Sequence, residues 1–216
     1  MAIIERIPPT ISSILSSGTQ IEIATGIAIA TFYGIDLVDK NILTDVPQYG
    51  DVSAVRLDEG GNDETPQDFD LPVKKGFIIE GEGSVSCELL VYNASGGTIT
   101  KTPTITISII KDTGSESTLI SNTKVLNLLN IADGTSQVQR ITVGLTIPRT
   151  NFAIGDILRV RIGSSDIGGN EEIFVGTDPK NDTGGDVRLS RAFGHVSAAF
   201  ADKTLIFLCP FVVDIN

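Results

Sequence analysis

Alternating hydrophobic and polar positions run through most of this chain, most clearly between residues 137 and 163. The inward candidates there are Ile141, Val143, Leu145, Ile147, Leu158, Val160 and Ile162. A period of two with many β-branched residues is typical of half-buried strands. Pro148 is expected to end the first strand, because it has no N–H for the ladder. This segment therefore predicts two strands joined by a turn.

The same pattern predicts further strands along the chain. They cover residues 19–32 with Gly26 as a candidate bulge, 35–38, 52–57, 77–79, 84–93, 104–111, 118–130 and 205–213. Residues 104–111 are expected to form a hairpin with the strand before them. Residues 58–72 and 164–185 are acidic and rich in glycine, so we expect exposed loops. Residues 205–213 are apolar at both parities, which predicts a strand that is central or covered on both faces.

The number and spacing of these strands favour an all-β protein. We expect an antiparallel β-sandwich, a single jelly roll of about eight strands in which the first and last strands are neighbours. An immunoglobulin-like sandwich is the second choice, since the chain has no tryptophan for the pattern of that fold. One domain over residues 19–216 is expected, preceded by an extended N-terminal arm over residues 1–18.

Net charge and targeting signals limit the classes of molecule that this protein is expected to bind. A formal charge of −11 argues against nucleic acid and anionic membranes as partners, since both attract clustered Lys and Arg. The N-terminus lacks the basic and apolar regions of a signal peptide, and the run 205–213 is far shorter than the roughly 20 residues that span a bilayer. Cys87 and Cys209 belong to no metal-binding or redox motif. Buried free thiols are expected, although a bridge is open if their strands are neighbours.

Candidate chemistry is sparse. His195 is the single histidine, which excludes most Ser/His/Asp, Cys/His and multi-histidine zinc schemes. We expect no enzymatic activity and no cofactor, although a carboxylate pair for glycoside hydrolysis stays open. Calcium binding also stays open, because two acidic loops could supply oxygen ligands. Their candidate ligands are Asp58, Glu59, Asn62, Asp63 and Glu64 in one loop, and Asp178, Asn181, Asp182 and Asp186 in the other.

Three arginines stand out in this acidic chain. Arg140, Arg159 and Arg161 occupy outward positions of the two strands in 137–163. If those strands were neighbours, the arginines would form one basic stripe able to contact an acidic face of another subunit. The alternative is that each arginine pairs with Asp or Glu inside the molecule.

The last third of the chain carries a pattern that resembles a known family. The stretch IPRTNFAIGDILRVRIG, the later GTDPKN and the closing strand LIFLCPF resemble a layout found in virion proteins of tailed phages, of the jelly-roll head decoration or cement type. The similarity covers about residues 141–215. It implies a homo-oligomer, commonly a trimer, that binds the major capsid protein on the outside of an icosahedral shell after synthesis in the host cytoplasm.

Apolar surface left over after folding is where subunits meet. We therefore expect residues 205–213 or 27–32 near a subunit interface, and the N-terminal arm on the shell. The predicted interface residues are Ile3, Ile4, Ile7, Ile11, Ile14, Leu15, Ile29, Phe32, Arg140, Arg159, Arg161, Phe207 and Phe211. Two alternatives remain: a carbohydrate- or receptor-binding module of a virion fibre, and a small enzyme on a sandwich.

Overall fold

The computed structural model describes residues 22–24, 26–37, 39–50, 54–59, 66–93, 102–128, 131–165, 171–180, 186–188, 195–197 and 204–212. These residues form fourteen strands, and none of them is helical. The strands are β1 (Glu22–Ala24), β2 (Ile27–Leu37), β3 (Lys40–Thr44), β4 (Ala54–Glu59), β5 (Gln67–Pro72), β6 (Phe77–Asn93), β7 (Thr104–Asp112), β8 (Glu116–Val125), β9 (Ser136–Phe152), β10 (Ile157–Ser165), β11 (Glu171–Gly176), β12 (Asp186–Arg188), β13 (His195–Ser197) and β14 (Leu205–Val212). No helix long and apolar enough to cross a bilayer occurs in this described part.

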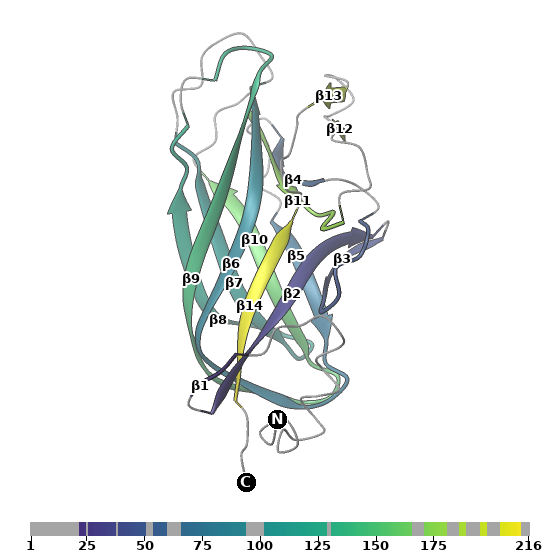
Figure 1. The fold of residues 1–216 in the computed structure, drawn as a ribbon, viewed down its shortest axis with the longest axis vertical. Coiled ribbons are helices and arrows are strands. Elements are labelled where there is room, and N and C mark those ends of the chain that lie inside the picture. Colours follow the sequence, from purple (N-terminus) through teal and green to yellow (C-terminus); the bar gives the residue numbers. More distant parts are fainter. Residues whose placement is uncertain are drawn as a thin grey trace.

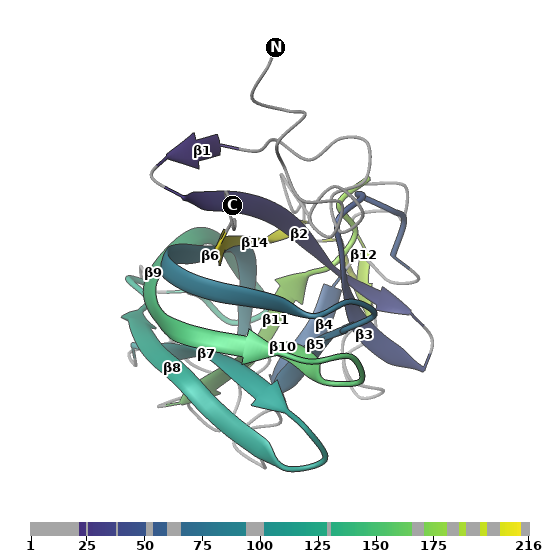
Figure 2. The same ribbon diagram turned by 90° about the horizontal axis from the view of Figure 1, so that it is seen from below.

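Eight of the strands form two layers in the order of a jelly roll. One layer is β2-β14-β6-β9 and the other is β5-β10-β7-β8. Figure 2 shows the two layers facing each other across the core. The expected pairing of the first and last of these strands is confirmed, since β2 and β14 pair along Ile27–Gly34 and Leu205–Val212. The predicted all-β sandwich is therefore confirmed, with more strands than the eight expected.

Short strands and a side-chain contact join the layers at their edges. On one side, β3 pairs antiparallel with β2 and meets β5 through the pair Ile42 and Asp70 (Figure 1). On the other side, Asn122 Nδ2 of β8 donates a hydrogen bond to the Gly144 carbonyl of β9 at 3.0 Å. The pair β4 and β11 extends the sheet beside the second half of β6, and β12 pairs with β13 apart from the rest.

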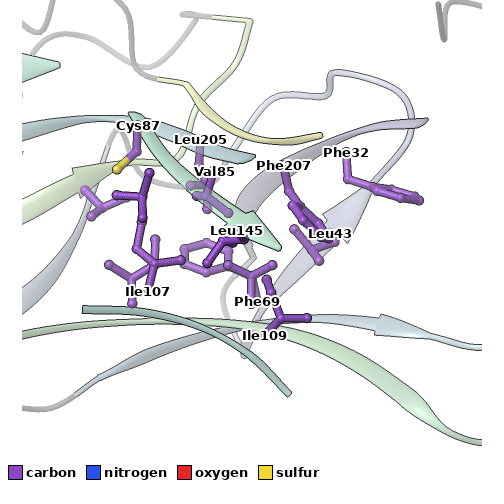
Figure 3. Packing of buried hydrophobic residues seen from close by; sticks show 14 of the residues in the cluster. Phe32, Leu43, Phe69, Val85, Cys87, Ile107, Ile109, Leu145, Leu205 and Phe207 are labelled. Carbon is purple, nitrogen blue, oxygen red and sulfur yellow. The ribbon is translucent and has the colours of Figure 1, made fainter. Parts of the chain in front are cut away.

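The core lies between the layers and consists of the side chains that point inward from each strand. The clearest rows follow the sequence prediction, with Ile141, Val143, Leu145 and Ile147 on β9 and Leu158, Val160 and Ile162 on β10, all buried. Figure 3 shows side chains from both layers, among them Phe69, Ile107, Leu145 and Phe207, meeting in this cluster. Burying each such side chain contributes about 1.5–3 kcal/mol. The apolar cluster therefore supplies most of the force that holds the layers together.

Pro148 does not end its strand, contrary to the prediction. β9 continues to Phe152, because the β6–β9 register shifts between Ile79 and Gly81 and leaves an extra residue on the β9 side. Pro210 of β14 lies at a second register shift on the other side of β6. A bulge relieves a proline of the need to donate to the ladder. Gly81 lies at the β6–β9 register shift with a φ of 112°, a conformation that glycine adopts readily. β6 therefore continues through residues 77–93 as one strand, where two strands were expected.

Several other local expectations are corrected by the pairing of strands. Gly26, with a φ of 78°, lies in the turn between β1 and β2 and is not a bulge within one strand. β7 forms its hairpin with β8 and not with β6. The segments 58–72 and 164–185 were expected to be loops, yet they contain β5 and β11, whose Phe69 and Phe174 are buried. The predicted strand within 118–130 is present as β8.

Candidate functional site

One face of the β2–β14 pair carries large apolar side chains on the outside of the sandwich. Residues that are directly opposite in an antiparallel pair share a face. Phe32 and Phe207 are opposite each other and buried in the core, so the other parity points outward. Thr31 and Tyr33 of β2 share this outward parity. We call the surface formed by Ile27, Ile29, Ile206, Leu208 and Val212 the apolar outer face. Leu208 is 36% exposed, and the other four are half-buried.

The sizes of the inward residues explain why large side chains remain outside. Ala28 lies opposite Phe211 and Ala30 lies opposite Cys209, and all four are buried. The small alanines leave room for the phenylalanine rings, and Phe32 lies 6.4 Å from Phe207 and 6.1 Å from Phe211 between ring centroids. The isoleucines of β2 that alternate with these alanines therefore point outward, away from the core.

The apolar outer face ends at β6. Farther across the same layer the outward residues are polar: Ser84 and Ser86 on β6 and Thr142 and Thr146 on β9. Ser86 Oγ and Thr142 Oγ1 are 3.0 Å apart, and Thr146 Oγ1 donates to Glu82 Oε1 at 2.9 Å. These hydroxyls hydrogen-bond with neighbours on the surface, so the outward residues of β6 and β9 beside Ile206 and Leu208 are polar.

Part of the predicted interface set is wrong. Phe32, Phe207 and Phe211 are 1%, 0% and 2% exposed within a single chain, so their side chains have no surface to offer a partner. Ile29 lies on the apolar outer face, and its place in an interface stays a prediction. The arm residues Ile3, Ile4, Ile7, Ile11, Ile14 and Leu15 lie outside the described residues.

Sequence reasoning missed which parity of residues 205–213 faces outward, because both parities are apolar. A usable signal was in the partner strand. The small residues Ala28 and Ala30 alternate with isoleucines, and small residues inside a sandwich leave space for aromatic rings from the opposite strand. That signal places these isoleucines of β2 on the outer face of the sheet. Ile206, Leu208 and Val212 of β14 lie on the same outer face.

The three arginines do not form one stripe. Arg140 lies on β9 opposite Glu88, whereas Arg159 and Arg161 lie on β10 in the other layer. Arg159 Nε and Nη2 donate to the two carboxylate oxygens of Asp70 at 2.6 and 2.9 Å. Arg161 Nε and Nη2 bind Asp68 in the same bidentate way at 2.6 and 2.7 Å. For these two, the intramolecular alternative is the correct one.

Two further carboxylates complete this cluster. Glu116 accepts hydrogen bonds from Arg159 and from Arg161 Nη1, the latter at 2.9 Å, and Asp112 lies 3.7 Å from Arg159. Hydrogen bonds from Arg161 are the main cause that lowers the pKa of Glu116, and the pKa values of both arginines are raised by their carboxylate partners. Two guanidinium groups face Asp68, Asp70, Asp112 and Glu116, so the formal charge of the cluster is 2 − 4 = −2. The cluster is therefore an ion-paired surface and not a basic one.

The two cysteines are buried and free. Their strands, β14 and β6, are neighbours, but Cys87 lies opposite Leu205, four positions from Cys209. Four residues of strand correspond to about 13 Å, too far for a disulfide. Burial raises the pKa of the Cys87 thiol to about 12 and raises that of Cys209 as well. Neither thiol is available as a nucleophile.

The acidic loops contribute no metal cluster within the described residues. No group of three or more His, Cys, Asp and Glu side chains is placed there to hold an ion. Asp178 is buried and accepts a hydrogen bond from the Gly50 N–H at 3.3 Å. Asp58 and Glu59 belong to β4, Asp186 belongs to β12, and His195 begins β13. Asn62, Asp63, Glu64, Asn181 and Asp182 lie outside the described residues.

Comparison with known proteins identifies the fold alone. No protein-family model and no curated protein matches the chain. A CocE/NonD family hydrolase from Staphylococcus aureus is similar in structure, with a TM-score of 0.55 and 7% identity over 91% of this chain and 37% of the hydrolase. This chain therefore spans little more than a third of the hydrolase. A carbohydrate-binding structure described as CBM4 has a TM-score of 0.28 and 12% identity over 74% of this chain and 78% of its own. The VP2 protein of infectious bursal disease virus has a TM-score of 0.32 and 13% identity over 88% of this chain and 41% of VP2.

Proposed function

We propose that this chain is a non-enzymatic structural protein of a virion, a capsid decoration protein. In this proposal it binds the outside of an icosahedral shell as a homo-oligomer, a trimer, and stabilises the shell. The observation that carries the proposal is the apolar outer face of β2 and β14. Contiguous apolar surface of this kind marks a place where another protein binds.

The shape of this face favours a protein partner over a small substrate. Sites for small molecules are concave, whereas Ile29, Ile206 and Leu208 lie on the outer surface of a sheet. Obligate subunit interfaces resemble a domain core cut in half, with large aliphatic side chains in contact. β1 pairs with β2 at the edge of this face, and in this proposal the segment before β1 continues from that edge to the shell. The same edge can therefore serve subunit contact and attachment to the shell.

The oligomer is tested by light scattering coupled to gel filtration. The wild-type chain is expected to be a trimer at micromolar concentration. Leu208→Glu places a charge on the apolar outer face and is expected to shift the chain towards monomer with an unchanged far-ultraviolet circular dichroism spectrum. Thr142→Glu, on the polar part of the same layer, is the matched control and is expected to remain trimeric. A monodisperse wild-type monomer contradicts the oligomer.

Attachment to the shell needs its own experiment. Shells assembled from the major capsid protein encoded with this chain are mixed with the purified protein and sedimented. Saturable co-sedimentation and a higher shell melting temperature are expected. Glycan-array binding without co-sedimentation would favour the alternative, a carbohydrate- or receptor-binding module of a virion fibre.

A further inference from the structure

A cavity of about 540 Å³ opens at the side of the sandwich, between β3 and the turn that joins β5 to β6. Its lining combines apolar and charged residues. Phe32, Leu43 and Val73 are buried and we call them the floor; Ile42, Leu71 and Phe77 are half-buried; Lys40, Lys74 and Lys75 are exposed and we call them the mouth. The volume lies in the range of small-molecule sites, roughly 300–1,000 Å³.

The strand arrangement explains why the sandwich is open at this point. Along one edge of β2, β1 pairs with residues 27–29 and β3 pairs with residues 33–37. Within the described part of the chain, residues 30–32 lie between these two partners, and β3 meets β5 through one residue pair. The layers are therefore incompletely bridged beside Phe32. In Figure 3, Phe32 lies at one end of the labelled cluster, beyond Phe207, and Leu43 lies beside Phe207.

The charge at the mouth is unusual for this protein. The whole chain has a formal charge of −11, yet the lining has Lys40, Lys74 and Lys75 against one carboxylate, Asp45, a formal charge of 3 − 1 = +2. Both features together define the ligand: an apolar floor binds a hydrocarbon chain, and a cationic mouth favours an anionic end.

We propose that this cavity binds a single-chain amphiphile with a carboxylate head, such as a medium-chain fatty acid. The hydrocarbon chain contacts Phe32, Leu43 and Val73, and the carboxylate lies among the three lysines. This inference goes beyond the proposed capsid function and does not depend on it, because the cavity lies within one chain and the lysines are part of the same fold.

Chain length and charge make separable contributions to affinity. Each further methylene that enters an apolar site tightens binding about fourfold. Exposed ion pairs are weaker, about fivefold or less for each lysine. The hydrocarbon chain therefore sets most of the affinity, and the lysines set the preference for an anionic head.

The test is titration of the full chain by calorimetry and methyl NMR, with octanoate, decanoate, decanol and decyltrimethylammonium below their micelle concentrations. Decanoate is expected to bind more than tenfold more tightly than octanoate and more tightly than decyltrimethylammonium. The largest methyl shifts are expected at Leu43, Leu71 and Val73. Equal affinity for decanoate and decyltrimethylammonium overturns the proposal, as does the absence of binding.

Variants separate the cavity from the rest of the surface. The triple variant Lys40→Gln, Lys74→Gln, Lys75→Gln is expected to lose the preference for decanoate while its affinity for decanol is unchanged. Lys124→Gln, an exposed lysine on β8, is the charge control and is expected to bind like the wild type. Ile42→Trp fills the cavity and is expected to abolish binding of both decanoate and decanol, with folding checked by thermal melting. Methyl shifts confined to Ile29, Ile206 and Leu208 would assign the binding to the apolar outer face and refute the cavity.

Discussion

Gly34 lies where the first and last strands of the jelly roll pack against each other, and a methyl group added there gives a sharp test of the fold. It is opposite Leu205 of β14 on the inward face. A Cβ atom at Gly34 would meet Leu205 Cδ2 first, with Leu205 Cγ at 2.8 Å and Phe69 Cδ1 at 3.0 Å. Leu205 and Phe69 are both fully buried. The extra methyl therefore has no free space to occupy.

The size of the effect follows from the crowding at Leu205. Overpacking a core by a methyl group costs about 1–3 kcal/mol, and we expect Gly34→Ala to lower the free energy of unfolding by that amount. Leu205→Ala alone removes buried atoms and leaves a cavity, which costs about 2–5 kcal/mol. In the double variant the new methyl enters the space that Leu205 vacates. The double variant should be no less stable than Leu205→Ala, which corresponds to a favourable coupling of about 1–3 kcal/mol.

Urea unfolding followed by far-ultraviolet circular dichroism at one fixed protein concentration measures these values. Gly144→Ala is the matched control, because Gly144 lies on the outward parity of β9 in the same layer and an added Cβ has nothing within 4 Å. That variant should change stability by less than about 0.5 kcal/mol. The reasoning is refuted if Gly34→Ala is as mild as Gly144→Ala, or if the double variant loses the sum of the two single losses.

Three further predictions concern charges and thiols. Hydrogen bonds from Ala153 N–H and Lys111 lower the pKa of Asp156. The ionised Asp156 therefore stabilises the fold fully above the ordinary pKa of an aspartate, and this stabilisation is lost as pH falls through the lowered pKa. Asp156→Asn should flatten the acid side of a plot of melting temperature against pH, and parallel curves for variant and wild type would contradict this. Arg159→Gln leaves its carboxylate partners facing one another and should cost about 1–3 kcal/mol in urea unfolding, less in 1 M NaCl; a loss independent of salt would argue against the ion pairs. Cys87 and Cys209 should react with Ellman's reagent only after unfolding, so rapid labelling of the native protein would show that a thiol is accessible.

The alternation of apolar and polar residues by itself determined the class of the fold. It placed Ile141, Val143, Leu145 and Ile147 on one face of a strand, because side chains alternate strictly along an extended backbone. The apolar run 205–213 likewise predicted a central strand, and β14 lies between β2 and β6. These features are local, so the sequence carries them without knowledge of distant partners.

Only the tertiary structure decided most of the other strand pairings and which apolar face remains outside the core. Asp70 and Asp68, which bind Arg159 and Arg161, belong to β5, an acidic segment that local composition assigns to a loop. Pro148 stays within its strand because a bulge forms against a distant segment of chain. Where both parities are apolar, as in β14, the pattern cannot distinguish the face that packs on the core from the face that remains outside. That choice depends on the sizes of the side chains across the sheet, which residues far apart in the sequence supply.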